Sequence, residues 1–553
     1  MNITVNARDA QTVTLSVSGP VMASEIADRL QGNLPYEILS CRVNNYVSRL
    51  NVMLEKDCVL DLLDLRDPSA NMTYQTSLTM LYLRAVHEVL GPEIKVTIAN
   101  SLSKGLFTVI HAGGVSDETA GQISAAMRRM AASDLPLTGR TVCRREMLEI
   151  AAGLNDGGRQ REMFENAPDL DCAQLYELAG EQEFFYHDMV PSTRYLKWFE
   201  VRRYKNGMLL RFPHPSRPDE MQPYAEQKLL YEAFSETTRW ERLMGVEETC
   251  GLNELVLNDR FQDMVLLSEA LHEKRIAEIA GQIHDSGKRI ILIAGPSSSG
   301  KTTFARRLCI QLRVAGLRPL YLGTDDFFVD REDTPLNEKG ERDYESLNAL
   351  DIDLFTRDMN ELLRGKKVDL PEYDFLSGRK IFGRRVTSIE NSQPIVIEGI
   401  HGLNPLLTEG IPDSQKFKIY ISPLTQLNID GHSRIPTTDA RMLRRIVRDY
   451  KFRGYSAEET IHSWPNVRAG EDRNIFVFVD QADVFFNSNC IYELAVLKRY
   501  AEPLLKRIRP EQPEYPEAQR MLEFLALFAA VQDDSIIPNN SIMREFIGGS
   551  VLV

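Results

Sequence analysis

Apolar and polar residues alternate with a period of two near the start of the chain, which predicts β-strands. The segments "NITV" and "TVTLSV" alternate in this way, a helix-like "MASEIADRL" follows, and "SCRVNN" and "CVLDLLDL" again have the pattern of strands. The first residues lack the basic head and apolar core of a signal peptide. Residues 1–66 therefore predict a small β-rich domain.

Helical and strand-like periods are mixed over residues 67–230. Residues 75–91 carry apolar side chains at helical spacing and end at a glycine, residues 95–110 alternate, and residues 117–134 form an amphipathic pattern with Asp or Ser at each end. This mixture predicts a second domain of α+β type. Residues 231–287 are rich in helical periods and predict a helical connector.

Compact apolar runs then alternate with helical stretches over residues 288–510. The runs are "RIILIAG", "PLYLGTD", "PIVIEGI", "KIYIS" and "DVFFNS", and they are rich in Ile and Val. Parallel strands that are buried on both faces have this composition. We expect an α/β domain with a mostly parallel sheet and helices on both faces. Residues 511–553 predict a C-terminal helical extension, whose apolar segment 520–531 is either a core element or the surface of a homo-oligomer.

Composition limits the possible partners. With 553 residues the chain is long enough for several domains, and its net charge of -14 disfavours bulk attraction to nucleic acid or to anionic membranes. No apolar run reaches the roughly 18 residues that span a bilayer. The seven cysteines are scattered without a CxxC pair, which is typical of reduced cysteines in a cytosolic protein. We therefore expect a cytoplasmic protein with no membrane partner.

One short segment carries a strong phosphate-binding signal. It reads Gly295, Pro296, Ser297, Ser298, Ser299, Gly300, Lys301, Thr302 and Thr303, which matches G-x-x-x-x-G-K-[ST] between a strand at 290–294 and a helix at 302–314. The glycines let backbone N–H groups face the phosphates of ATP, the lysine adds a positive charge, and the hydroxyl of Thr302 can bind Mg²⁺. A chance Gly/Ser turn is the alternative, and the strand and the helix on either side argue against it.

Acidic residues follow the next two predicted strands. Asp325 lies at the C-terminal edge of the first of them, where α/β proteins bind ligands, and could accept the proton of an attacking hydroxyl. Asp326 is the adjacent alternative. Glu398 ends the following strand, which suits a contact with Mg²⁺. A solvated acidic loop and a helix-capping glutamate are the ordinary structural alternatives.

A basic cluster follows further along the chain, with few acidic residues among its arginines. Arg441, Arg444, Arg445 and Arg448 share one face of a predicted helix, and Arg453 follows it. Such a cluster could close over ATP and neutralise charge on the transferring phosphoryl group. A solvated basic surface is the alternative.

These motifs together resemble the uridine kinase/phosphoribulokinase family of P-loop kinases. GPSSSGKTT, TDDFF, LPEYDF, IEGIHGL and RRIVRDYKFRG occur in this order over about 288–490. The resemblance implies transfer of a phosphoryl group from ATP to a hydroxyl of a small molecule. It implies Asp325 as base, Lys301 and Thr302 at phosphate and metal, and Glu398 near the metal. Arg445, Arg448 and Arg453 match the family's lid.

The sequence departs from the family where uridine kinases recognise their acceptor. Tyr344 and Glu345 replace the Phe-Asp of a Phe-Asp-His-Pro motif whose Asp holds the ribose hydroxyls, so Glu345 could still do so. Tyr373 belongs to the matching Tyr-Asp-Phe motif, but a glycine, Gly378, stands where the family has a histidine that contacts the pyrimidine. Tyr455 replaces an arginine of the lid. Asp326, Tyr344, Glu345 and Tyr373 remain candidate acceptor contacts, whereas recognition of uracil does not follow.

The front half resembles another family. Residues 1–66 are similar to the β-grasp-like TGS domain at the start of threonyl-tRNA synthetases, and residues 67–230 to the editing domain that follows it there. The editing residues of that family fall at Tyr74, Leu78, Phe185 and Met189, none of which can replace histidine as a ligand or base. His187 lies nearby, but a lone histidine is more often structural. The resemblance thus implies an editing fold without editing chemistry, which could bind a ligand, dimerise or regulate the kinase.

Three functions remain open from the sequence. The first is a kinase for a nucleoside, with ATP and Mg²⁺ as cofactors and a small hydroxyl compound as acceptor. The second is a kinase for a polyol or sugar, which the changes at residues 378 and 455 keep open. The third is a nucleotide-regulated protein whose front half binds RNA or a partner, against which the acidic charge argues.

Overall fold

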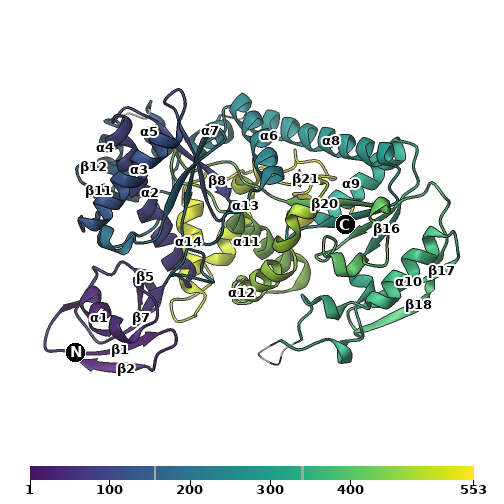
Figure 1. Cartoon of the computed structure of the whole chain (residues 1–553), viewed down its shortest axis with the longest axis horizontal. Helices are drawn as coiled ribbons and strands as arrows, with labels where there is room; N and C mark the ends of the chain where they lie inside the picture. The colour runs from purple at the N-terminus through teal and green to yellow at the C-terminus, as the bar shows by residue number, and fades with distance from the viewer. Residues whose placement is uncertain (155–156, 259, 338–339, 341) are drawn as a thin grey trace.

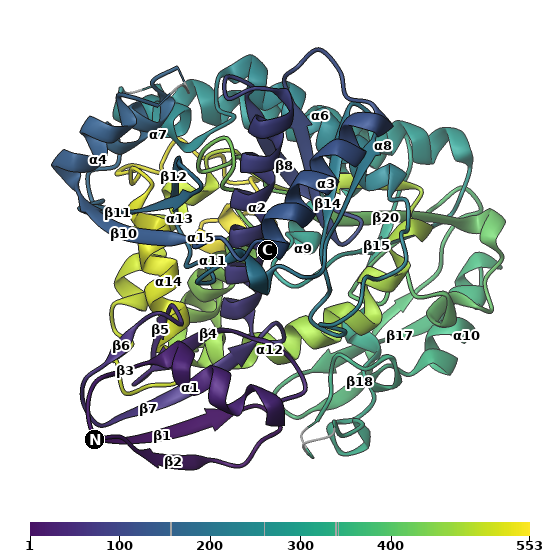
Figure 2. The same cartoon turned by 60° about the vertical axis from the view of Figure 1, so that its left-hand side comes forward.

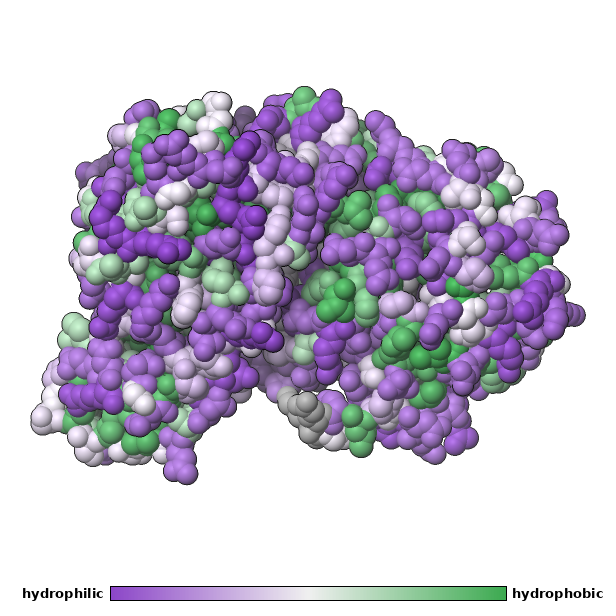
Figure 3. Space-filling model, viewed as in Figure 1, coloured by the Kyte–Doolittle hydropathy of each residue, from purple (hydrophilic) through white to green (hydrophobic). Residues whose placement is uncertain are grey.

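The computed structural model describes residues 1–154, 157–258, 260–337, 340 and 342–553. The N-terminal domain projects from one end of the molecule, and the P-loop sheet lies at the other end (Figure 1). The molecular surface is mostly hydrophilic, with apolar side chains in small groups and an indentation between the N-terminal domain and the kinase region (Figure 3). None of the helices in the described ranges combines the length and the apolarity needed to cross a bilayer.

The N-terminal domain is a mixed sheet packed against one helix, α1 (Ala23–Leu30). The strand order is β2-β1-β7-β4-β5, and β1 pairs parallel with β7 and antiparallel with β2. The strands are β1 (Asn2–Ala7), β2 (Val13–Ser16), β4 (Ile38–Val43), β5 (Tyr46–Ser48) and β7 (Cys58–Asp64), with a short pair β3 (Val21–Met22) and β6 (Met53–Leu54). Ile3 and Val5 are buried on β1, as the alternation predicts.

The second region is built around one long, largely buried helix, α2 (Pro68–Leu90). Asp67 caps this helix through the N–H of Ser69, and Pro68 occupies its first turn. Two antiparallel sheets accompany it, in the orders β13-β14-β9-β8 and β10-β11-β12. The other elements are β8 (Val96–Leu102), β9 (Gly105–Ile110), α3 (Asp117–Ala132), β10 (Thr138–Cys143), α4 (Arg144–Ala151), α5 (Arg159–Glu165), β11 (Cys172–Leu178), β12 (Glu181–Phe185), β13 (Glu200–Tyr204) and β14 (Gly207–Arg211).

Three helices, α6 (Lys228–Met244), α7 (Thr249–Leu257) and α8 (Phe261–Ser286), lead from this region to the P-loop sheet. The sheet has the order β16-β19-β15-β20-β21, and every pair of neighbours in it is parallel. Its strands are β15 (Ile290–Ala294), β16 (Leu320–Gly323), β19 (Ile395–Glu398), β20 (Lys416–Ser422) and β21 (Val484–Asn487). The expectation of an α/β P-loop fold with a parallel sheet is confirmed for this part of the chain.

Alternate residues of β15 enter two different cores, so both faces of the sheet are covered. Ile291 and Ile293 pack with α8 and α9 (Lys301–Val314), whereas Ile290 and Leu292 pack on the side of α10 (Ile352–Leu363). A hairpin of β17 (Val368–Asp374) and β18 (Arg379–Thr387) lies beside α10. Helices α11 (Thr437–Arg448), α12 (Ala457–Asn474) and α13 (Glu493–Leu505) follow β20 and β21.

The apolar side chains of the C-terminal segment enter the core of the molecule. Its helices are α14 (Tyr515–Ala526) and α15 (Arg544–Ile547). Phe524 of α14 belongs to one continuous core together with Phe164 from the front half and Leu443 and Tyr492 from the kinase region. Figure 2 shows α14 between the N-terminal domain and the strands β10 and β11, and α15 beside α11. The apolar segment predicted at 520–531 is therefore a core element in this chain. Its helix, α14, begins at Tyr515 and ends at Ala526, nearer the N-terminus than predicted.

Candidate active site

The P-loop has the strained backbone that phosphate binding requires. Ser298 and Gly300 adopt left-handed conformations, with φ of 60° and 82°. A side chain at Gly295 would place its Cβ 2.1 Å from the carbonyl oxygen of Ile421, so only glycine fits there. A non-glycine residue in the left-handed region is uncommon, and Ser298 is a sign that the loop is shaped for a ligand.

Lys301 and the metal candidates lie at the end of this loop. The ammonium of Lys301 donates hydrogen bonds to the carbonyls of Gly295 and Pro296, at 3.0 and 3.1 Å, and burial lowers its pKa. Thr302 donates from its hydroxyl to Glu398 at 2.9 Å, and Tyr321 donates to the same carboxylate oxygen at 3.1 Å. A hydroxyl and a carboxylate held together in this way form a donor set that suits Mg²⁺.

Asp325 and Asp326 point to different surroundings. Asp326 is held by Arg385 of β18 at 2.8 Å, and the same arginine donates to the carbonyl of Tyr321. Asp325 is exposed, so its carboxylate is accessible. Desolvation by the surrounding protein atoms and, secondly, the carboxylate of Glu398 raise the pKa of Asp325 to about 6, although Lys301 opposes the shift. Asp325 is therefore the free carboxylate of the two, and Asp326 is engaged in an ion pair.

One buried carboxylate organises the three predicted lid arginines. Asp449 lies 3.2 Å from Arg445, 3.2 Å from Arg448 and 3.3 Å from Arg453. Arg445 also donates to the hydroxyl of Ser297 at 2.8 Å, which ties the cluster to the P-loop. Burial lowers the pKa of Arg448 to about 10, so it remains cationic at neutral pH. The structure thus brings all three arginines to the phosphate loop.

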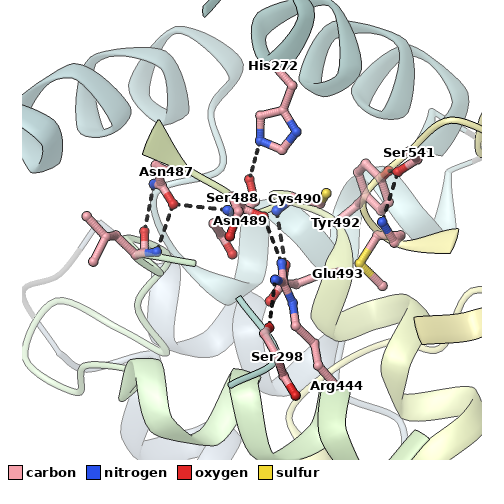
Figure 4. A network of polar contacts seen from close by, with 12 residues as sticks. His272, Ser298, Arg444, Asn487, Ser488, Asn489, Cys490, Tyr492, Glu493 and Ser541 are labelled. Atoms are coloured by element: carbon pink, nitrogen blue, oxygen red, sulfur yellow. Dashed lines mark hydrogen bonds and ion pairs between the residues drawn. The ribbon is translucent and has the colours of Figure 1, made fainter. Parts of the chain in front are cut away.

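Arg441 and Arg444 differ from the expectation of a basic lid face. Both are fully buried: Arg441 pairs with Glu471, and Arg444 pairs with Glu493. Arg441 donates to the carbonyl of Ser297 at 3.0 Å, and Arg444 donates to the carbonyls of Ser298 and Ser488 (Figure 4). These two arginines support the P-loop from behind and cannot swing over a nucleotide, because each has a buried ion-pair partner.

The candidate acceptor contacts border the same site. Glu345 is half-buried, and desolvation followed by the charge of Glu471 raises its pKa to about 7. The rings of Tyr344 and Tyr373 both contact Phe328 edge-on, with centroids 5.7 and 5.6 Å away. The structure therefore places an aromatic wall and a titratable carboxyl group on the acceptor side, with Asp326 turned away to Arg385.

The glycine at position 378 has a local cause. Gly378 has a φ of 71°, and its carbonyl accepts a hydrogen bond from the N–H of Arg331 at 2.8 Å. A Cβ at this position would lie 2.7 Å from the Arg331 side chain. The turn between β17 and β18 is thus built for glycine, and the Arg331 side chain fills the space that a larger residue would need.

Two further groups reach the site that were not among the predicted site residues, and one of them comes from outside the motifs. Glu545 of α15 accepts hydrogen bonds from the hydroxyl of Thr303 at 2.7 Å and from its backbone N–H at 3.3 Å. His401, within the IEGIHGL motif, is 1% exposed, and both of its ring nitrogens lack a hydrogen-bond partner in the described part of the chain. Burial lowers the pKa of His401 to about 4, so the ring is neutral at pH 7. Its place beside Glu398 in the motif was the available signal for His401, whereas Glu545 had none.

The front half holds a loop of the kinase region. Tyr74, Leu78, Phe185 and Met189 are all buried in one hydrophobic core. The ring of His432, from the loop between β20 and α11, lies 4.7 Å from the ring of Phe185, and its Nε2 is 2.9 Å from the carbonyl of Phe184. These four positions thus provide packing, and the kinase loop is fixed against them. Burial lowers the pKa of the neighbouring His187 to about 4.

The known proteins to which this chain is similar match its kinase region. Residues 290–493 match the family described as "Phosphoribulokinase / Uridine kinase family". The chain is 30% identical to a uridine kinase of Ligilactobacillus salivarius over 175 residues, which is 32% of this chain and 73% of that protein. It is 31% identical to a uridine kinase of Staphylococcus haemolyticus over 178 residues, 32% of this chain and 76% of that protein. A solved structure of a possible uridine kinase from Bacillus stearothermophilus aligns at 23% identity over 38% of this chain and 97% of the other, with a TM-score of 0.25. Through residues 290–493, the chain belongs to the phosphoribulokinase/uridine kinase family of kinases.

Proposed function

We propose that this chain transfers the terminal phosphoryl group of ATP to a hydroxyl group of a small molecule, with a nucleoside as the acceptor. The observation that carries the proposal is the accessible carboxylate of Asp325, close enough to Lys301 and Glu398 for their charges to act on its pKa. A switch or motor needs the P-loop but needs no free carboxylate that can accept the proton of an acceptor hydroxyl. The relatives named as uridine kinases support a nucleoside as the class of acceptor.

The phosphates of ATP would bind to N–H groups of residues 298–302, at the N-terminus of α9. Lys301 would leave the carbonyls of Gly295 and Pro296, which it now contacts, and move to the phosphates. Arg445, Arg448 and Arg453 would neutralise charge on the transferring group, with Asp449 keeping them in position. Thr302 and Glu398 would hold Mg²⁺, which neutralises charge on the phosphates when it is bound.

Asp325 would accept the proton of the attacking hydroxyl as the new O–P bond forms and the bond to ADP breaks. A carboxylate whose pKa is raised to about 6 is a stronger base than an ordinary aspartate and is still ionised at pH 7. Glu345 would hold hydroxyl groups of the acceptor, because its carboxyl group borders the same site. Tyr344, Tyr373 and His401 would complete the acceptor side.

A second acceptor class is favoured by one observation. The Arg331 side chain occupies the space beside Gly378, where uridine kinases have the histidine that contacts the pyrimidine. Loss of a polar recognition group normally costs much specificity for the base. A polyol or a sugar is therefore the alternative acceptor, and both candidates use the same phosphoryl-transfer residues.

The test is a screen of nucleosides, ribose phosphates, sugars and sugar alcohols for acceptor-dependent release of ADP. It is run with the wild type, with Asp325→Asn and with Asp333→Asn as the matched control, because Asp333 is an exposed aspartate on the following loop. We expect one compound to stimulate ADP release in the wild type and in the control, and not in Asp325→Asn. If no compound exceeds buffer while total RNA binds tightly with a steep salt dependence, a nucleotide-regulated binding protein replaces this proposal.

A further inference from the structure

A cavity of about 600 Å³ lies between the front half and the kinase region, away from the P-loop. Its walls come from the end of α2, the strand β12, the start of α7 and the loop between β20 and α11. The charged residues that line it and carry the argument are Lys95, Arg159, Glu183, Glu248, Asp430 and His432. The buried positions Tyr74, Leu78, Phe185 and Met189 are not among the residues that line this cavity. The cavity is therefore separate from both sites considered above.

One side of the cavity carries carboxylates with unused acceptor capacity. Asp430 is 6% exposed, and its Oδ2 has no hydrogen-bond partner among the described residues, while its Oδ1 accepts from the N–H groups of His432 and Ser433. The side chain of Glu183 forms no hydrogen bond or ion pair with any residue in the described ranges. Burial raises the pKa of Glu183, and His432 opposes the shift. His432 lies 3.7 Å from Asp430 and can offset one of the two acids, while His87 pairs with Glu181 and Arg84 with Glu88. This side therefore keeps an excess of negative charge.

The other side has an excess of positive charge. Lys95 and Arg159 both face the same carboxylate oxygen of Glu248, at 3.8 and 3.1 Å. One carboxylate cannot neutralise two cations, and both basic side chains are partly open to solvent. A ligand carboxylate could therefore approach them without first breaking a buried ion pair.

The two excess charges favour an organic ligand over a metal ion. Among the described residues, the one group of three potential metal ligands that lie close together is Glu269, His272 and Cys490, which is elsewhere in the fold. We propose that the cavity binds a small zwitterion of the α-amino acid type, with its ammonium group between Glu183 and Asp430 and its carboxylate at Lys95 and Arg159. The volume is several times that of a small amino acid, so the cavity also has room for a side chain.

The position of the cavity connects it to the kinase. Asp430 and His432 belong to the loop that enters α11, and the N–H of Ile98 in β8 donates to the carbonyl of Gly431 in the same loop at 2.9 Å. Helix α11 carries Arg441 and Arg445, which contact Ser297 of the P-loop. A ligand that changes the position of this loop would therefore change the affinity for ATP, and ATP would change the affinity for the ligand by the same factor.

The binding test uses the full chain without nucleotide, so its outcome does not depend on the proposed kinase activity. The standard L-α-amino acids are added one at a time at millimolar concentration, and the thermal midpoint is measured. We expect at least one of them to raise it saturably by about 2 °C or more. Its N-acetyl derivative and its amide, each lacking one of the two charges, should have no effect.

Two variants locate the site. Glu183→Gln and Asp430→Asn should each weaken the affinity for that amino acid about tenfold, and the amide introduced by Asp430→Asn keeps an oxygen for the loop N–H groups. Glu177→Gln is the matched control, because Glu177 is an exposed glutamate on β11, the strand next to β12. The proposal is overturned if no amino acid raises the midpoint, or if both site variants bind as the control does. Equal affinities for ATP with and without the bound amino acid would overturn the coupling to the kinase.

Discussion

The carboxylate of Glu545 accepts hydrogen bonds from both the hydroxyl and the backbone N–H of Thr303, in the first turn of the P-loop helix. This turn is where a phosphate of ATP would bind, because helix N-terminal N–H groups and the helix dipole favour an anion there. Ile542 belongs to the same C-terminal segment as Glu545. Its side chain lies 2.6 Å from the position that a Cβ on Gly300 would occupy. The C-terminal segment thus places a carboxylate at a position suited to a phosphate group.

Glu545→Gln should therefore strengthen binding of ATP. The substitution removes a negative charge that a phosphate group would have to approach or displace. We expect a gain of about 1 kcal/mol, which is roughly a fivefold lower Kd for ATP in equilibrium titration. Glu511→Gln, an exposed glutamate before α14, is the control and should leave the Kd unchanged. Weaker binding in Glu545→Gln would mean that this carboxylate supports the nucleotide site.

Asp325→Asn should separate chemistry from nucleotide binding. Asparagine has the same shape but cannot accept the proton of the acceptor hydroxyl, so kcat should fall by about 10²–10⁴-fold. The Kd for ATP should change less than about threefold, because the P-loop and Lys301 remain. Single-turnover kinetics with the best acceptor, together with equilibrium binding of ATP, measures both. An equal fold loss in kcat and in the affinity for ATP would indicate that Asp325 acts on the binding of ATP.

Activity should fall as the pH decreases through the pKa of Asp325. The pKa is raised to about 6, so the carboxylate is protonated below this pH and cannot act as a base. We expect kcat/KM to be flat above about pH 7 and to fall about tenfold per pH unit below 6. Asp326 is one of the charges that raise this pKa. In Asp326→Asn the fall should therefore move to lower pH, whereas an unchanged profile would assign it to another group.

The parts of the site that follow from local sequence could be predicted. Gly295 and Asp325 lie just beyond the C-terminal ends of apolar strands, and Lys301 begins the helix that follows the first of these strands. Parallel strands bring their C-terminal ends to one edge of the sheet. The groups that arrange them are distant in sequence. Glu545 contacts a residue 242 positions away, and Glu471 accepts a hydrogen bond from Ser297 174 positions away. No local pattern indicates which distant carboxylate will meet a given helix end.

Helix α11, which carries the arginines, is a second case in which distant segments decide what the local sequence could not predict. Helical spacing put Arg441 and Arg444 on the same face as Arg445 and Arg448, but spacing alone does not say which part of that face is covered. The packing of α12, α13 and α15 against α11 decides this, because α12 supplies Glu471 as the partner of Arg441 and α13 supplies Glu493 as the partner of Arg444. A sequence with one-sided charge therefore formed a fully buried support and, on neighbouring turns, a cluster that is only partly open to solvent.

The buried pair of Arg444 and Glu493 should matter for stability far more than a surface pair. Both side chains are at most 1% exposed, and Arg444 also holds the carbonyls of Ser298 and Ser488. Glu493→Gln keeps the shape but leaves the arginine charge unpaired in the interior. We expect a loss of about 3–5 kcal/mol in the free energy of unfolding of the kinase region, measured by urea titration.

The matched control for this prediction is Glu502→Gln in the same helix. Glu502 pairs with Lys506, whose side chain is 63% exposed, so its removal should cost less than about 0.5 kcal/mol. Because Arg444 supports the loop backbone, Glu493→Gln should also weaken ATP binding at temperatures where the protein is still folded. Equal stability of the two variants would show that Arg444 finds another partner, and the P-loop would then not depend on this ion pair.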